Sequence, residues 1–292
     1  MRHVSALMLA AALLVAAPAR SDATGCDRAC LRGIITQYLA ALVVHDPSRL
    51  PVAKNVRFTE DSVEKHLGEG LWQTADALRP FRQDVLDVRQ AIAGTHAIVE
   101  EHGAPVMLVL RLKIVSGTIT EVETMVVRNR AEGLIFEPDA LKAASPAMNI
   151  VPIPAQRTKR EAAIRIAERY PMGLRDGSFV KADVPFADGA YRLEGGRLMA
   201  GPGCAFLPGC DNIRTQRIPT LPAITWQVAA VDEDLGIVWL WENFGKGSVP
   251  TPNMALVAWE MFKVYGGQIH AVEAFMKQMP DGTARGWNSA TR

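Results

Sequence analysis

A repeated pattern in the two halves of the chain constrains the fold more than any other feature of the sequence. The segment 111–123, RLKIVSGTITEVE, aligns without a gap with the segment 261–273, MFKVYGGQIHAVE. The identical positions are Lys113/Lys263, Gly117/Gly267, Ile119/Ile269, Val122/Val272 and Glu123/Glu273. A shift of 150 residues is the length of a whole domain and far exceeds a solenoid repeat. The sequence therefore predicts a tandem duplication of one domain.

Each half is expected to begin with a helix and to continue as strands. Leu31, Ile34, Ile35, Tyr38 and Leu42 are spaced as one face of a helix over residues 26–45, and Ala163, Ile166, Ala167 and Tyr170 repeat that spacing. Extended runs follow at 97–100, 106–115 and 119–128, and again at 224–231, 237–244, 255–264 and 269–276. A helix followed by antiparallel strands predicts an α+β fold, with helices on one face of a curved sheet.

The expected domain organisation has four parts. Basic residues at 2–3, an apolar run at 4–17 and small residues up to 23 are typical of a secretory signal peptide, residues 1–23. The first domain then covers 24–144, a proline-containing linker 145–159, and the second domain 160–292. No later run approaches the roughly 20 apolar residues of a membrane span. We therefore expect a periplasmic or secreted protein without a span in its mature part.

The four cysteines form two close pairs, Cys26/Cys30 and Cys204/Cys210. In an exported chain an even number of cysteines favours disulfides, and local pairing of Cys204 with Cys210 is the expected bridge. A zinc site is the alternative, although no histidine lies at ligand spacing beside either pair. The second half is also longer around Cys204 and Cys210, which indicates an inserted loop.

Composition and motifs narrow the classes of function. A net charge of +1 with 22% charged residues gives no basic surface for nucleic acid. The chain has no phosphate-binding glycine loop, no G-x-S-x-G elbow and no H-E-x-x-H pair. We expect no metal and no cofactor, and a small-molecule ligand as the partner. A homo-oligomer stays open.

Several motifs carry a family resemblance over nearly the whole mature chain. They are Thr59-Glu60-Asp61, the segment 67–72 (LGEGLW), Arg111-Leu112-Lys113, the segment 119–124 (ITEVET), the segment 231–236 (VDEDLG) and Gly286-Trp287. These residues resemble a family of exported bacterial and fungal proteins in the SnoaL-like (nuclear-transport-factor-2-like) superfamily. The resemblance implies two tandem cone-shaped α+β barrels, each a curved antiparallel sheet packed on helices around an apolar pocket. It also implies either a cofactor-free isomerase, dehydratase or lyase, or a non-catalytic member.

Glu123 and Glu273 are the foremost catalytic candidates. Each shares the face of its strand with apolar residues, and a desolvated carboxylate has a raised pKa that suits acid–base catalysis. The alternative is a buried structural acid held by a fixed donor. Because Arg111 is replaced by Met261 and Glu121 by Ala271, the first half is expected to carry the site. Glu123 would then be the base and Arg111, across the turn at 116–117, its electrostatic partner.

Other residues complete the predicted site. Glu60, Glu121 and His66 are further catalytic candidates, with a surface position as the alternative for His66. An aromatic wall with nearby polar groups would bind substrate, and core packing is the alternative for the tryptophans. The substrate-binding candidates are Phe58, Trp72, Tyr191, Arg192, Trp239 and Trp241.

Two functions of different classes fit these residues. One is an exported, cofactor-independent lyase or isomerase that eliminates water or formaldehyde from a small aromatic or hydroxylated apolar substrate, such as a lignin-derived dimer. The other is a non-catalytic ligand-binding or interaction protein. A buried carboxyl group of raised pKa would favour the enzyme, and two cones filled with side chains would favour the binding protein.

Overall fold

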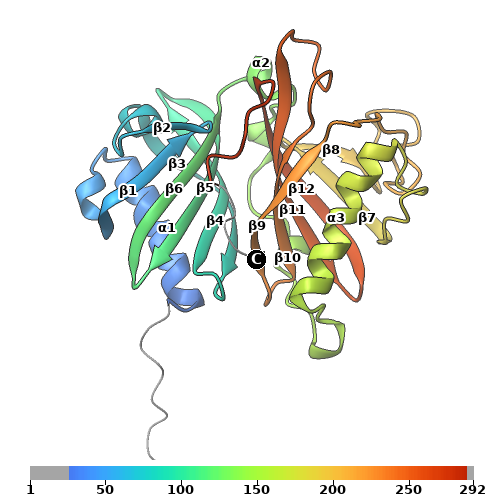
Figure 1. The fold of residues 1–292 in the computed structure, drawn as a ribbon, viewed down its shortest axis with the longest axis horizontal. Coiled ribbons are helices and arrows are strands. Elements are labelled where there is room, and N and C mark those ends of the chain that lie inside the picture. The colour runs from blue at the N-terminus through green and yellow to red at the C-terminus, as the bar shows by residue number, and fades with distance from the viewer. Residues whose placement is uncertain (1–25, 288–292) are drawn as a thin grey trace, which may run out of the picture.

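The computed structural model describes residues 26–287, and the predicted signal peptide lies outside this range. The described chain forms two six-stranded sheets, each covered by one long helix (Figure 1). The first half contains α1 (Arg28–Leu42), β1 (Val52–Glu60), β2 (Val63–Lys65), β3 (Ala75–Asp87), β4 (Ile92–Glu101), β5 (Ala104–Val115) and β6 (Thr118–Val127). The second contains α3 (Arg160–Asp176), β7 (Phe186–Glu194), β8 (Arg197–Ala200), β9 (Thr225–Asp232), β10 (Ile237–Asn243), β11 (Met254–Tyr265) and β12 (Gln268–Pro280), after the short α2 (Arg130–Gly133). No helix between residues 26 and 287 is long and apolar enough to cross a membrane.

The two sheets have the same topology, and the predicted fold class is confirmed. Their strand orders are β2-β1-β6-β5-β4-β3 and β8-β7-β12-β11-β10-β9, with β1–β6 and β7–β12 parallel and the other pairs antiparallel. Glu123 pairs with Arg111 in one sheet, and Glu273 pairs with Met261 at the same place in the other. We call residues at the same register position in the two sheets counterparts.

Each helix packs on one face of its own sheet and encloses a cone-shaped core. In the first half the buried helical residues Leu31, Ile35 and Tyr38 pack on alternate strand residues such as Leu110. In the second half α3 uses the same spacing, with Tyr170 at its centre, and ends at Gly177 in the left-handed conformation that favours glycine. We call these two regions the first cone and the second cone.

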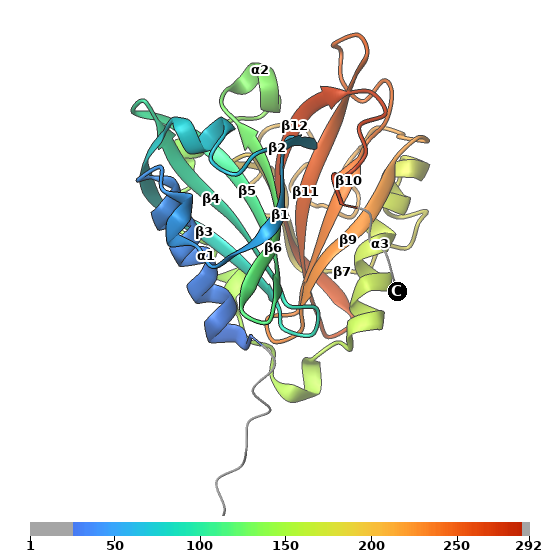
Figure 2. The same cartoon turned by 60° about the vertical axis from the view of Figure 1, so that its left-hand side comes forward.

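The faces turned away from the helices pack against each other, so the sheets lie between α1 and α3 (Figure 2). The contact is apolar and close. A Cβ atom at Gly94 would lie 2.1 Å from the Trp239 ring, so only glycine fits there. We call this contact the interface between the halves.

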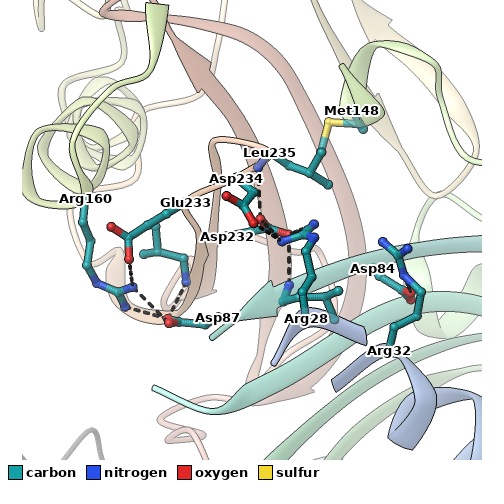
Figure 3. Close-up of polar contacts among 12 residues, drawn as sticks. Arg28, Arg32, Asp84, Asp87, Met148, Arg160, Asp232, Glu233, Asp234 and Leu235 are labelled. Carbon is teal, nitrogen blue, oxygen red and sulfur yellow. Dashed lines mark hydrogen bonds and ion pairs between the residues drawn. The ribbon is translucent and has the colours of Figure 1, made fainter. Parts of the chain in front are cut away.

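Two ion pairs repeat each other across the interface (Figure 3). Arg28, the first residue of α1, binds both oxygens of Asp232 at 2.6 and 2.7 Å. Arg160, the first residue of α3, binds both oxygens of Asp87 at 3.0 and 2.6 Å. Each aspartate also accepts a backbone N–H of the opposite half, from Leu86 or Val231. The halves are therefore joined by a reciprocal contact of the kind that a two-fold dimer makes.

Both cysteine pairs are disulfide-bonded, Cys26 with Cys30 and Cys204 with Cys210. The predicted disulfides are confirmed, and all four sulfurs are engaged in bridges rather than in a zinc site. Structural disulfides are typical of proteins in oxidising compartments such as the periplasm or the extracellular space.

Candidate functional site

Glu123 and Arg111 lie opposite each other on neighbouring strands, as predicted, but they face the interface between the halves. Glu123 is buried, and Arg285 of the C-terminal segment donates to it at 3.1–3.3 Å. Arg111 lies 3.1 Å from Glu121 and 3.9 Å from Glu123. A small cavity of about 10 Å³ lies beside Glu123, lined also by Trp241 and Trp259. The Arg285 guanidinium holds the Glu123 carboxylate in a fixed position in the packed interface, so this arrangement favours a structural role.

Glu273 faces the same interface from the second half. Tyr191 donates to it at 2.6 Å, and Ser145 lies 2.7 Å from the Tyr191 oxygen. Burial raises the pKa of Glu273, although the hydrogen bonds from Tyr191 and Ser145 oppose that shift. Glu123 and Glu273 are counterparts, paired with Thr59 and Leu193 on the parallel strands β1 and β7.

The remaining first-half candidates fall in separate places. Phe58 and Trp72 are buried and fill the first cone, where the Trp72 indole donates to the Tyr38 hydroxyl at 2.9 Å. Glu60 accepts from Lys65 and from the Leu71 backbone at the edge of that cone. His66 is exposed in the loop after β2. The structure does not bring Glu60, His66 and Glu123 into one site.

Trp239 and Trp241 lie at the interface between the halves and outside both cones. Trp239 packs against Trp259, with ring centroids 4.6 Å apart, and its indole donates to His96 at 3.3 Å. Burial lowers the pKa of His96 to about 3, so this ring is neutral at physiological pH. Trp239 therefore packs the interface, and Trp241 lines only the small cavity beside Glu123.

The second cone holds a polar cluster around Arg192. This guanidinium is buried, donates to the Tyr170 hydroxyl at 3.0 Å and to Gln216 at 3.1 Å, and lies 2.8 Å from Glu194. Because Tyr170 comes from α3 and Arg192 from β7, the cluster joins the helix to the sheet.

Two fully buried glutamates lie beside Arg192, on the same face of the sheet. Glu242 in β10 and Glu260 in β11 occupy diagonal positions on neighbouring strands. Burial raises the pKa of Glu260 to about 8, with Glu194 adding to the shift and Arg192 opposing it. Burial and the neighbouring Glu260 raise the pKa of Glu242 well above its ordinary value. Both carboxyl groups therefore keep their protons at neutral pH. We call Tyr170, Arg192, Glu194, Glu242 and Glu260 the second-cone cluster.

Comparison of counterparts shows that this cluster is peculiar to the second half. Tyr38 and Glu60 of the first cone correspond to Tyr170 and Glu194 of the second. Three apolar positions of the first cone are ionisable in the second, namely Phe58/Arg192, Ala97/Glu242 and Leu110/Glu260. Of the first-half candidates, the structure brings Arg111, Glu121 and Glu123 together at the interface between the halves, whereas Glu60 and His66 lie elsewhere.

Sequence reasoning missed Glu242 and Glu260, although a signal was present. In β10 the residues Leu240 and Glu242 alternate with Trp239 and Trp241, so the acid faces away from the tryptophans. The tryptophans drew attention to the opposite face. An acid within a run of apolar β-branched and aromatic residues is the signal that could have identified the site.

Trp226 pairs with Glu242 across β9 and β10, is half-buried and packs on the core of the second cone. Its indole donates to Glu168 at 3.3 Å, and Arg175 stacks 4.7 Å from its ring. Trp226 thus adds a partly exposed aromatic ring to the second cone.

Comparisons with known proteins place this geometry in context. The model of a domain of unknown function (DUF8021) matches residues 156–276. No curated protein matches the sequence. Among solved structures, the chain is similar to a proposed ketosteroid isomerase from Kribbella flavida, with 12% identity, a TM-score of 0.28, and coverage of 43% of this chain and 91% of the other. It is also similar to a nuclear-transport-factor-2-like protein of unknown function from Shewanella baltica, with 12% identity, a TM-score of 0.27, and coverage of 41% and 97%.

Proposed function

We propose that the protein is an exported, cofactor-independent lyase or isomerase whose reacting site is the second-cone cluster. The observation that carries this proposal is the pair of buried carboxyl groups, Glu242 and Glu260, beside Arg192. Two coupled acids in an apolar site can hold one group as a proton donor while the other accepts a proton. This placement replaces Glu123 as the base, because Glu123 is ion-paired outside both cones.

The cluster provides the groups that an elimination requires. In the reactive form one carboxyl group has lost its proton and removes a proton from carbon, while its protonated neighbour donates to the leaving hydroxyl, which departs as water. Arg192 and Tyr170 stabilise negative charge that develops on a substrate oxygen. Leu240, Phe262 and Trp226 belong to the apolar and aromatic core that surrounds the cluster. A small aromatic or hydroxylated apolar compound, including a lignin-derived one, suits this combination.

A specific observation favours the second candidate, a non-catalytic binding protein. Side chains fill both cones, with Trp72 in the first and Gln216 in the second. A cone that stays filled would bind no substrate, and the chain would then act through its outer surface.

A ligand screen followed by substitution tests the two candidates. Phenolic and hydroxylated compounds that bind the native state should raise the midpoint of thermal unfolding. With a compound that turns over, Glu260→Gln should lower kcat on the order of 100-fold while ligand binding is kept.

Glu123→Gln is the matched control. It should lower stability, because Arg285 and Arg111 lose their partner, and leave kcat near the wild-type value wherever the variant is folded. Full turnover in Glu260→Gln would refute the proposed site, and binding without any turnover would favour the binding protein.

A further inference from the structure

A long loop closes the second cone, and a shorter segment closes the first. Residues 201–224 connect β8 to β9, whereas residues 66–74 connect the corresponding strands β2 and β3. The long loop is held at its start by the Cys204–Cys210 bridge and at its end by the buried residues Leu221 and Ile224. We call residues 201–224 the lid.

The lid places one polar side chain in the second cone. Gln216 is 7% exposed, its Oε1 accepts from Arg192 Nη2 at 3.1 Å, and its Nε2 donates to the Met199 carbonyl at 2.7 Å. In the first cone the corresponding segment inserts Trp72, which bonds to Tyr38. The first cone is thus filled by the large indole ring of Trp72, whereas the lid contributes only the smaller amide of Gln216 to the second cone.

Gln216 is carried by an otherwise exposed part of the lid. Its neighbours Thr215 and Arg217 are exposed. A hollow of about 120 Å³ lies between the lid residues Asp211–Arg214 and the start of β7. Gln216 does not line this hollow, so displacement of its amide from Arg192 requires a movement of the lid itself.

The charges around Arg192 define the group that could replace the Gln216 amide. Arg192 already lies 2.8 Å from Glu194 and interacts electrostatically with Glu260, which in turn neighbours Glu242. An anionic ligand would add negative charge to a buried site with three carboxyl groups and one guanidinium, which is costly. A cationic ligand would face the guanidinium. An uncharged oxygen acceptor, as in the amide itself, fits.

We infer that Gln216 occupies the position of the ligand's oxygen, and that the ligand is an uncharged carbonyl compound that displaces this side chain from Arg192. The inference rests on the proposed location of the site in the second cone. It adds the substrate class and identifies the lid residue that competes with the substrate.

Calorimetric titration with a neutral aryl ketone and a matched anion tests this inference without turnover. The probes are acetophenone and benzoate, and the variants are Gln216→Ala and Gln216→Asn, whose shorter amide withdraws the acceptor. A hydrogen bond to a charged group contributes enough that its loss from the competitor should tighten acetophenone binding about tenfold in Gln216→Ala and several-fold in Gln216→Asn. Trp72→Phe, which changes the other cone, should bind as wild type.

Unchanged or weaker acetophenone binding in both Gln216 variants would overturn the inference. An equal gain for benzoate, or no binding of acetophenone to any variant, would overturn it as well. Tighter acetophenone binding in the Gln216 variants, together with full turnover in Glu260→Gln, would support the ligand class and refute the proposed catalytic role of Glu260. Failure of this inference can therefore be told apart from failure of the proposed function.

Discussion

Three side chains convert an apolar cone into a polar one. Phe58, Ala97 and Leu110 of the first half give way to Arg192, Glu242 and Glu260 at the corresponding register positions. An isolated buried carboxylate is costly, so the acid retains its proton and the cost appears as a raised pKa. The pH dependence of stability should therefore report the cluster directly.

We expect the contribution of Glu260 to wild-type stability to fall as pH rises from the ordinary glutamate pKa to about 8. The folded protein keeps a proton on Glu260, whose pKa is raised to about 8, while the unfolded chain has lost it. Stability from this group is complete below the ordinary glutamate pKa and is lost as pH rises towards 8. The slope is about 1.4 kcal/mol per pH unit for each retained proton. Urea unfolding of wild type and Glu260→Gln should show a shallower slope in the variant, and equal slopes would contradict the assignment.

A pair of glycines tests the packing between the halves. Gly94→Ala introduces a Cβ atom into the Trp239 ring, so its free energy of unfolding should fall by about 1–3 kcal/mol. Gly33 lies within α1, and a Cβ atom added there would meet nothing within 4 Å. Gly33→Ala should therefore raise stability by about 0.5–1 kcal/mol. Denaturant titration of both variants provides the comparison, and a neutral Gly94→Ala would show that the interface can relax.

At the scale of elements, each helix is fixed by its first residue to a turn of the other half. Arg28 and Arg160 bind the aspartates that close β9 and β3. The repeated lysines support the same turns, since Lys113 donates to the Gln90 carbonyl and Lys263 to the Leu235 carbonyl. Burial lowers the pKa of Lys263 to about 8. Lys113 and Lys263 are therefore present in both halves because each hydrogen-bonds to a carbonyl of the turn beside it.

Asp87→Asn and Asp232→Asn should have comparable effects, because the two contacts repeat each other. Each substitution leaves a partly or fully buried arginine with only its more distant carboxylate, Asp234 at 3.6 Å or Glu233 at 3.5 Å. A loss of about 3 kcal/mol is expected. Asp139→Asn, which breaks an exposed pair with Arg79, should change stability by less than about 1 kcal/mol. A large effect at only one of the two buried aspartates would show that the junction is not reciprocal.

Sequence patterns predicted elements better than faces. The helical stripe of α1, the hairpin of β5 and β6 around residues 116–117, and both disulfides could be predicted because they depend on neighbouring residues. The strand β3 was missed because its alternation mixes apolar residues with Arg79 and Arg82. The alternation of residues along the strand showed that Glu123 shares a face with apolar side chains. It could not show whether that face packs on the helix or on the other sheet, since each sheet buries both faces. The contact of Glu123 with Arg285, 162 positions away, leaves no local signal.

At the scale of the whole molecule, the two halves share one apolar contact. Its buried residues come from both sheets, among them Phe81, Met107, Trp239 and Phe275. Separation of the halves would expose this surface to water, which is unfavourable in proportion to its area.

The chain should therefore unfold in a single cooperative transition. Circular dichroism and tryptophan fluorescence should give the same midpoint, because each half buries an apolar sheet face against the other. Asp87→Asn should move the entire transition to lower denaturant. Two separate transitions, with only one shifted by the substitution, would show that the halves fold independently.

The reciprocal contact has a consequence for how such a molecule can change. In a dimer of identical subunits every substitution occurs twice, so an acid introduced into one cone is introduced into both, and its energetic burden doubles. Here the partners are joined in one chain, and a substitution falls on one side alone. One half can keep an apolar core that stabilises the whole chain. The other half can then hold buried ionisable groups that would destabilise a symmetric dimer if they occurred in both subunits.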